Sequence, residues 1–251
     1  ITVPDMKQLQ NLEIVICDNG VGFTEERFNK FEKLLDVEEQ SHKGLGRLVY
    51  LVYFANVKID SFFDDTQSRS FLFNESFEGE NVVSSIAKHE SGTTLKLYGF
   101  SGQRLHSNNY IRPSYLKKVI LEQFYMKLYK AKLAEKNIVI SISTNVAGRV
   151  ESEFIDVSKI PDFEVKELDY QRSLFEKVEL YYNIEETDIK EAGVITALAV
   201  DDRTHKVDII SSENFPKNYN MVFLLMSKSF NGDIVDGARV SLNMPEATLT
   251  E

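Results

Sequence analysis

The chain has 251 residues, of which 43% are hydrophobic and 27% charged, values typical of a globular protein that buries a core. A formal net charge of -10 argues against a broad nucleic-acid-binding face, although a local basic groove is compatible with it. No apolar run approaches the roughly 20 residues that cross a bilayer, and the single cysteine, Cys17, excludes an intramolecular disulfide. We therefore expect a cytoplasmic protein of one large or two modest domains, without a membrane segment.

The beginning of the sequence predicts one strand followed by two helices. An apolar run over 12–17 indicates a strand, in which we expect Cys17 to be buried and inert. A helix is predicted from about Thr24, which can cap its N-terminus, with an apolar stripe along one face. The stretch RLVYLVYFAN is too apolar for a surface helix and predicts a buried helix that ends at Asn56. The stripe of the first helix consists of Phe28, Phe31, Leu34 and Leu35.

Four short β-rich runs follow, separated by clusters of Asp, Gly, Ser and Asn, a pattern typical of an antiparallel sheet. Beyond a predicted boundary near residue 105 come a long helix over 114–137 and further strands. The β-rich runs are VKIDSFF (57–63), SRSFLFNESF (68–77), NVVSSIA (81–87) and TTLKLYGF (93–100). The stripe of the long helix is Leu116, Val119, Ile120, Phe124, Leu128 and Leu133. The later strands are IVISIST (138–144), EFIDV (153–157), VELYYNIE (178–185), GVITALAV (193–200), KVDIIS (206–211) and MVFLLMSKSF (221–230).

This order of elements predicts an α+β fold with two domains. Residues 1–105 are expected to form a mixed, mostly antiparallel sheet with helices on one face, and residues 106–251 a second α/β domain.

The first of three glycine-bearing segments, Asp18-Asn19-Gly20-Val21-Gly22, directly follows the first predicted strand. A bare Asn-Gly pair is the strongest signal of a two-residue hairpin, but the next residues have a helical period. A calcium loop is excluded because glycines stand where oxygen ligands are needed. A strand-to-loop transition remains, either as a plain connection or as a pocket where the glycines let a ligand approach the backbone beside Asp18.

The second segment, Lys43-Gly44-Leu45-Gly46-Arg47, lies immediately before the apolar helix. The N–H groups and dipole of a helix start favour an anion site there, although a glycine-rich connector also fits, and the spacing of a Walker loop is absent. In the third segment, Gly92-Thr93-Thr94, a hydroxyl could face a pocket, but threonine is also simply a good strand residue.

Taken together, in this order and context, the three segments resemble the glycine boxes of the GHKL superfamily of ATPases. This superfamily includes the ATPase subunit of DNA gyrase, the ninety-kilodalton heat-shock chaperone, sensor histidine kinases and MutL. The resemblance covers about residues 1–100 and implies a Bergerat-type α/β sandwich. The first box is matched by Asp18, Gly20 and Gly22, the second by Gly44 and Gly46, and the third by Gly92, Thr93 and Thr94.

The resemblance implies that the chain binds ATP together with Mg²⁺. Asp18 would accept a hydrogen bond from the exocyclic amine of adenine; a carboxylate can only accept, so it disfavours guanine, which presents a carbonyl there. Thr93 or Thr94 would support the same edge, and the loop over 43–47 would cradle the phosphates with its N–H groups, with Lys43 as an extra charge. The implied contact set is Asp18, Asn19, Gly20, Gly22, Phe23, Lys43, Gly44, Leu45, Gly46, Arg47, Thr93 and Thr94.

One part of the family pattern is missing from residues 1–17. The resemblance places an acidic residue that activates water, and an asparagine that holds magnesium, on a helix before the first glycine box. Either the native chain extends upstream, as the strand-like start Ile1-Thr2-Val3 favours, or the protein binds nucleotide without hydrolysing it. Mg-dependent ATPase activity is therefore an expectation without an assigned general base.

The second half is similar to the transducer domain of the chaperone, gyrase and MutL branches, and 230–249 resembles more faintly the middle domain of the chaperone. Histidine kinases lack such a domain, so a chaperone-, MutL- or MORC-like branch is expected. Transducer domains of the family lend a basic residue to the γ-phosphate. Charge and position alone offer three candidates for this contact, and for each of them a solvated surface role is favoured. The candidates are Lys206, Lys228 and Arg239.

The resemblance implies a conformational clamp in which nucleotide orders a lid over 36–47 and a homodimer closes on a protein client or DNA. The acidic charge favours a protein client. The alternative is a scaffold or interaction module that keeps the fold without hydrolysing nucleotide. The four histidines have no metal-ligand spacing, so no zinc site is expected.

Overall fold

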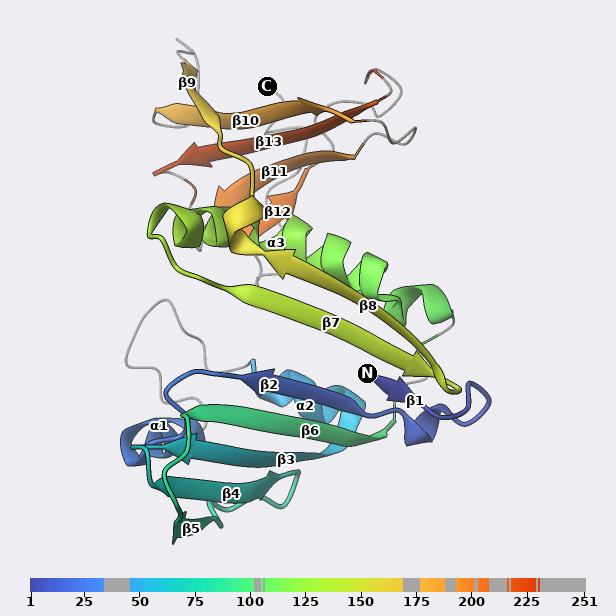
Figure 1. Ribbon diagram of the computed structural model, residues 1–251, viewed down its shortest axis with the longest axis vertical. Helices are drawn as coiled ribbons and strands as arrows, with labels where there is room; N and C mark the ends of the chain where they lie inside the picture. The colour runs from blue at the N-terminus through green and yellow to red at the C-terminus, as the bar shows by residue number, and fades with distance from the viewer. Residues whose placement is uncertain are drawn as a thin grey trace. The chain divides into compact units, whose positions relative to one another are not determined.

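The chain folds as two compact units in the computed structural model (Figure 1). The first unit comprises residues 1–113 and 143–152, and the second comprises 114–142 and 153–251. The structure describes residues 1–33, 46–101, 105, 107–168, 177–187, 193–200, 203–207, 216, 218–228 and 230.

In chain order, the first unit begins with β1 (Thr2–Val3), β2 (Ile14–Asp18), α1 (Glu25–Glu32), α2 (Leu48–Tyr53), β3 (Phe54–Phe63), β4 (Gln67–Phe73), β5 (Val82–Ser85) and β6 (Gly92–Phe100). There follow α3 (Pro113–Leu133), β7 (Val139–Val146), β8 (Arg149–Asp156), β9 (Glu164–Leu168), β10 (Val178–Glu186), β11 (Val194–Val200), β12 (Arg203–Lys206) and β13 (Tyr219–Ser227). Short 3-10 turns lie at Leu9–Asn11, Asn108–Ile111 and Val157–Lys159.

The first unit contains a five-stranded sheet of order β2-β6-β3-β4-β5, in which every pair is antiparallel. Both α1 and α2 pack on one face of this sheet (Figure 1). A smaller sheet of order β1-β7-β8 begins with the parallel pairing of β1 and β7. The predicted α+β fold with mixed, mostly antiparallel sheets is confirmed.

Helix α1 forms where the sequence predicts it. The Thr24 hydroxyl caps its start by accepting a hydrogen bond from the Arg27 N–H at 3.4 Å. Phe28 is buried, and Phe31 packs beside it against the sheet. The other two residues of the predicted stripe, Leu34 and Leu35, lie outside the described residues.

The apolar stretch that ends at Asn56 forms a shorter and more exposed helix than predicted. Phe54 already belongs to β3 and pairs with β6, so the prediction of a buried helix through Asn56 is wrong. In α2 itself, Val49 and Val52 are 52% and 66% exposed. A short apolar run with β-branched residues fits a helix and a strand equally, and pairing with β6 decides the outcome here.

Alternation along the strands builds the core of the first unit. In β3 and β4 the odd-numbered positions face the helices, and they carry Val57 and Ile59 on one strand and Phe71 and Phe73 on the other. A cluster of edge-to-face aromatic rings from α1 and β4, including Phe28 against Phe71 with centroids 5.1 Å apart, fills the space between helix and sheet.

Cys17 is exposed, which corrects the prediction of a buried thiol. It lies opposite Thr94 on the face of the sheet that the helices leave uncovered, and its sulfur accepts a hydrogen bond from the Thr94 hydroxyl at 3.5 Å. The apolar neighbours of Cys17 in sequence do not bury it because β2 is the last strand of the sheet.

The second unit contains a five-stranded sheet of order β12-β11-β13-β10-β9, with β11 and β13 parallel and the other pairs antiparallel. Helix α3 packs on one face, but its buried positions differ from the predicted stripe. Leu128 is buried as expected, whereas Leu133 is 63% exposed. The positions that the stripe missed are Tyr125, Met126 and Tyr129.

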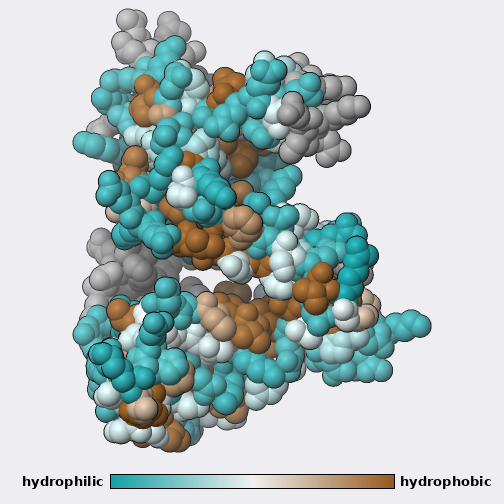
Figure 2. Space-filling model, in the orientation of Figure 1, coloured by the Kyte–Doolittle hydropathy of each residue, from teal (hydrophilic) through white to brown (hydrophobic). Residues whose placement is uncertain are grey.

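The visible face of the chain is mainly hydrophilic, with apolar side chains gathered in separate patches (Figure 2). Among the helices that the structure describes, none combines the length and the apolar composition needed to cross a bilayer.

Candidate functional site

A row of four polar residues crosses the apolar, helix-covered face of the first sheet. Cross-strand pairing places Asp18 of β2 opposite Thr93 of β6, Thr93 opposite Ser61 of β3, and Ser61 opposite Arg69 of β4. Directly opposed residues in a sheet project from the same face. The row therefore puts a carboxylate, two hydroxyls and a guanidinium side by side at the end of the sheet where β2 runs into the first glycine segment.

The loop after β2 lies so close to the sheet that two of its contacts require glycine. A Cβ on Gly22 would stand 2.2 Å from the Phe62 carbonyl oxygen, and Gly22 has a φ of +74°. A Cβ on Gly92, at the start of β6, would stand 2.4 Å from the Asp18 carbonyl oxygen. Gly22 and Gly92 are therefore needed because two backbone segments pack closely against each other. The sequence predicted a different reason, namely the close approach of a ligand. The loop continues into α1, which excludes the hairpin.

Ser61 is the centre of the hydrogen bonds that fix this loop to the sheet. Ser61 is 1% exposed, and its hydroxyl accepts a hydrogen bond from the Phe23 N–H at 2.8 Å. It also lies 3.1 Å from the Gly92 carbonyl oxygen and 3.1 Å from the Thr93 hydroxyl. One buried hydroxyl therefore connects the first glycine segment with the third.

Asp18 is exposed and not enclosed by the described residues, because it is the last residue of an edge strand. Its Oδ1 accepts a hydrogen bond from the Gly20 N–H at 2.8 Å, which holds the carboxylate against its own loop. A carboxylate oxygen has capacity for more than one donor. Asp18 is therefore a fixed acceptor that can still receive a hydrogen bond from a ligand.

The structure brings together only part of the predicted contact set. Asn19 lies exposed in the loop beside Asp18, whereas Thr94 projects from the opposite face of the sheet, toward Cys17. The ring of Phe23 packs edge-to-face on Phe31 and Phe71, with centroids 5.4 Å apart in each case, so it anchors the loop in the core. Of the two threonines, Thr93 is the one that shares a face with Asp18.

The second glycine segment is described only at its end, since Lys43, Gly44 and Leu45 lie outside the described residues. Apart from the neighbours of Gly46 in the chain, no atom of the described residues lies within 4 Å of the place that a Cβ on Gly46 would take. The Arg47 side chain is engaged elsewhere: its guanidinium donates to backbone carbonyls at the C-terminal end of α1, including that of Lys33 at 2.6 Å. Burial lowers the pKa of the Arg47 guanidinium from its usual value.

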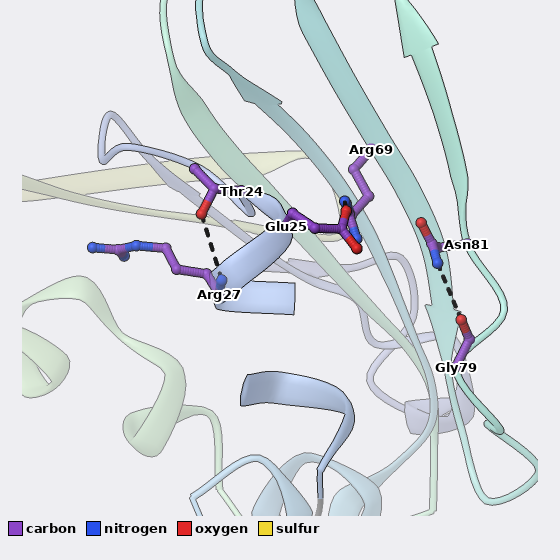
Figure 3. A network of polar contacts seen from close by, with 6 residues as sticks. All are labelled: Thr24, Glu25, Arg27, Arg69, Gly79 and Asn81. Carbon is purple, nitrogen blue, oxygen red and sulfur yellow. Dashed lines mark hydrogen bonds and ion pairs between the residues drawn. The ribbon is translucent and has the colours of Figure 1, made fainter. Parts of the chain in front are cut away.

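Sequence reasoning missed Ser61 and Arg69. A signal for both was present, because each is a polar residue at an inward position of a strand face that is mainly apolar. Arg69 is 2% exposed and pairs with Glu25 of α1, which is 74% exposed. Its guanidinium lies 4.3 Å from the centroid of the Phe28 ring. Figure 3 shows the Glu25 carboxylate directed at this guanidinium.

Within the described ranges, His, Cys, Asp and Glu side chains nowhere gather in groups of three or more that could hold a metal ion. Of the three candidate transducer cations, Lys206 and Lys228 are exposed in the second unit, and Arg239 lies outside the described residues.

No family model matches the chain, and no curated protein matches its sequence. Among solved structures, the chain is similar to the 43K ATPase domain of Thermus thermophilus gyrase B in complex with an aminocoumarin. The two share 11% identity with a TM-score of 0.43, over 87% of this chain and 69% of that chain. A likeness of this degree carries no conclusion about function.

Proposed function

We propose that the chain binds ATP through its first unit and acts as a conformational clamp of the GHKL type. The observation that supports this most is the row in which the Asp18 carboxylate stands beside the Thr93 hydroxyl on one face of the sheet. The row lies next to a loop fixed by Gly22 and Ser61. An acceptor held in place beside a hydroxyl suits the amine edge of adenine.

Replacing Asp18 with asparagine is expected to weaken ATP binding. A hydrogen bond to a charged group contributes about 1.5–3 kcal/mol, which corresponds to a loss of affinity of roughly 10- to 150-fold. The substitution also removes a negative charge from the neighbourhood of a polyanionic ligand, and that change alone would strengthen binding. A weaker affinity therefore reports the loss of the charged acceptor, since the asparagine amide oxygen accepts a weaker hydrogen bond. Calorimetric titration with MgATP and with MgGTP measures both the affinity and the preference for adenine.

Asp64→Asn is the matched control, because Asp64 is exposed in a turn with a φ of +48°, a conformation that asparagine tolerates well. It changes the net charge equally and should bind ATP like the unsubstituted chain. Binding of ATP with equal affinity by the Asp18→Asn variant would contradict the proposal, as would equal affinities for ATP and GTP.

In this proposal the phosphates are held by the second glycine segment, through Lys43 and the backbone of Gly44, Leu45 and Gly46. ATP would bring Mg²⁺ with its phosphates, since the described residues offer no cluster of acidic side chains for the ion. Hydrolysis requires a general base that the motifs of this sequence do not supply. The proposal for these residues is therefore nucleotide binding and the conformational change that binding drives.

The clamp would work as a homodimer of the chaperone, MutL or MORC kind on a protein client or DNA. The net charge of -10 favours a protein client. Binding of DNA that weakens steeply as salt rises would favour the DNA client instead.

A scaffold or interaction module that keeps the fold but has lost the nucleotide is the second candidate function, and one observation favours it. Gly22 and Gly92 are both explained by close backbone packing, so their presence does not require a ligand. Asp18 distinguishes the two candidate functions. Among the described contacts, its carboxylate accepts a hydrogen bond only within its own loop, and it is exposed beside Thr93. Its position is therefore not explained by packing alone.

A further inference from the structure

Strand β5 is an edge strand of the first sheet that no charged residue protects (Figure 1). All of its residues are exposed, and Val82 and Val83 are 66% and 48% exposed. Proteins usually protect an edge with charged side chains, proline or a bulge, because its unpaired N–H and C=O groups can bind a further strand. The uncharged segment 81–87 contains no proline, and β5 pairs with β4 in unbroken register. This edge is therefore open to another strand.

The other long edge strands in the described part of the chain all carry charge. Asp18 ends β2, and Glu153, Glu164 and Lys206 lie in β8, β9 and β12. A strand that pairs with a second copy of itself brings identical residues close together, so a charged edge is repelled by its own copy. Strand β5 can pair with itself without this repulsion.

The backbone of β5 directs part of its hydrogen-bonding groups away from the sheet. In an antiparallel ladder, opposed pairs alternate between pairs that exchange N–H···O bonds and pairs that do not. The Ile86 N–H donates to the Thr66 carbonyl oxygen at 2.8 Å, one step beyond the pair that includes Ser85. The pairs of Ser85 and of Val83 therefore exchange no bonds with β4. The N–H and C=O groups of these two residues point outward from the edge.

We propose that two copies of the chain associate through β5, antiparallel to each other, about a two-fold axis at Val83. In this register Val83 pairs with its equivalent, and Ser85 pairs with Asn81 of the second copy. The pairing uses the outward-facing N–H and C=O groups of all three residues. Because opposed positions project from the same face, the helix-covered faces of both sheets lie on one side, and the two sheets continue into one.

The charges that flank β5 favour a second copy in the antiparallel direction. Glu78 and Glu80 precede the strand and are exposed, and Lys88 follows it. The Lys88 side chain is 83% exposed and forms only a 4.0 Å pair with Asp65. Antiparallel pairing brings the acidic start of one β5 toward the Lys88 end of the other, whereas parallel pairing would place the glutamates side by side.

This dimer needs no nucleotide, so it stands apart from the proposed function. Pairing of two short strands buries little surface, and the association is therefore weak and depends on concentration. Sedimentation equilibrium of the full chain without nucleotide should show a dimer that grows with protein concentration and goes no further, because a two-fold contact occupies both edges. A chain that stays monomeric, or that forms larger assemblies, overturns the proposal and leaves ATP binding untouched.

Hydrogen exchange identifies the surface. As protein concentration rises, exchange should slow at the Val83 and Ser85 amides, which point outward in the monomer. The Ser84 amide faces β4 and should be protected equally at every concentration. A dimer that leaves the Val83 and Ser85 amides in fast exchange uses another surface and overturns the proposal.

Replacing Val83 with proline should raise the dissociation constant roughly 30-fold or more, because each copy loses one hydrogen bond across the axis. Proline is tolerated where the N–H points away from the sheet, so the bonds between β4 and β5 remain. Val83→Thr is the matched control, because it keeps the N–H and a β-branched side chain. It should change the dissociation constant by less than about fivefold. Equal effects of the two substitutions overturn the proposed register.

A charge exchange keeps the proposal testable if Val83→Pro fails to fold. Val83→Lys and Val83→Glu each place like charges opposite one another at the axis, so each variant alone should dimerise less than the unsubstituted chain. An equimolar mixture should form a heterodimer, because opposite charges then face each other. If the mixture dimerises no better than its two components, Val83 does not lie at the axis and the proposal fails.

Discussion

Replacing Glu25 with alanine is expected to destabilise the first unit by about 3 kcal/mol, because the change leaves a buried guanidinium without its carboxylate. Arg69 is 2% exposed and lies between the rings of Phe28 and Phe63, at 4.3 and 5.6 Å from their centroids. Its Nε has no hydrogen-bond partner among the described residues, so the pair with Glu25 provides most of its compensation.

The opposite substitution should have a much smaller effect. Arg69→Met keeps the aliphatic volume under Phe28, and it leaves behind Glu25, which is 74% exposed and can be hydrated. We expect a change below about 1 kcal/mol, of either sign. The cost of breaking this ion pair therefore depends on which partner is removed, since only one of the two is buried.

Urea denaturation followed by hydrogen exchange at the amides of β3 and β4 measures the stability of the first unit separately from the second. Glu26→Ala is the control, because Glu26 lies in the same first turn of α1 and forms an exposed pair with Lys30 at 3.2 Å. Its loss should cost no more than about 0.5 kcal/mol. Equal effects of the Glu25 and Glu26 substitutions would refute the prediction.

Replacing Gly22 with alanine should cost about 3 kcal/mol or more and disrupt the candidate site. A non-glycine residue in the left-handed region costs roughly 1–2 kcal/mol, and overpacking adds about 1–3 kcal/mol. The overpacking is severe here, because the new methyl group would stand 2.2 Å from the Phe62 carbonyl oxygen, which is backbone and cannot swing away. The loop would have to leave the sheet, and the hydrogen bond from the Phe23 N–H to Ser61 would lengthen.

Gly148→Ala isolates the conformational part of this cost. Gly148 has a φ of +86° in the turn between β7 and β8, and no described residue beyond its chain neighbours has an atom within 4 Å of its Cβ position. It belongs to the same compact unit, so one denaturation experiment compares the two variants. If Gly22→Ala costs no more than Gly148→Ala, the loop does not lie against β3 as the structure has it.

Local patterns predicted most of the elements but not the pairing between them. The cap at Thr24 and the spacing of Phe28 and Phe31 were enough to locate α1, because helix signals lie within a few residues of one another. The predicted end of α2 was wrong because Phe54 pairs with β6, a strand that lies much further along the chain. Cys17 is exposed because β2 is an edge strand, and the order of strands in a sheet cannot be predicted from the sequence of a single segment.

The same distinction holds for the candidate site. Asp18 and Thr93 could be singled out because each stands in a short glycine motif. Ser61 and Arg69 stand in no motif, and they join the site only through the register that sets Ser61 between Thr93 and Arg69. An inward polar position in a mainly apolar strand face is the one local signal that marks them.

Chemical-shift mapping of the backbone amides of the full chain during addition of MgATP tests the proposed binding site most directly. We predict that the largest shifts occur over 18–22 and at Gly92 and Thr93, and that they are lost or strongly reduced in the Asp18→Asn variant. The absence of shifts in the unsubstituted chain, or shifts confined to the strands of the second unit, would show that Asp18 and Thr93 do not form an adenine site.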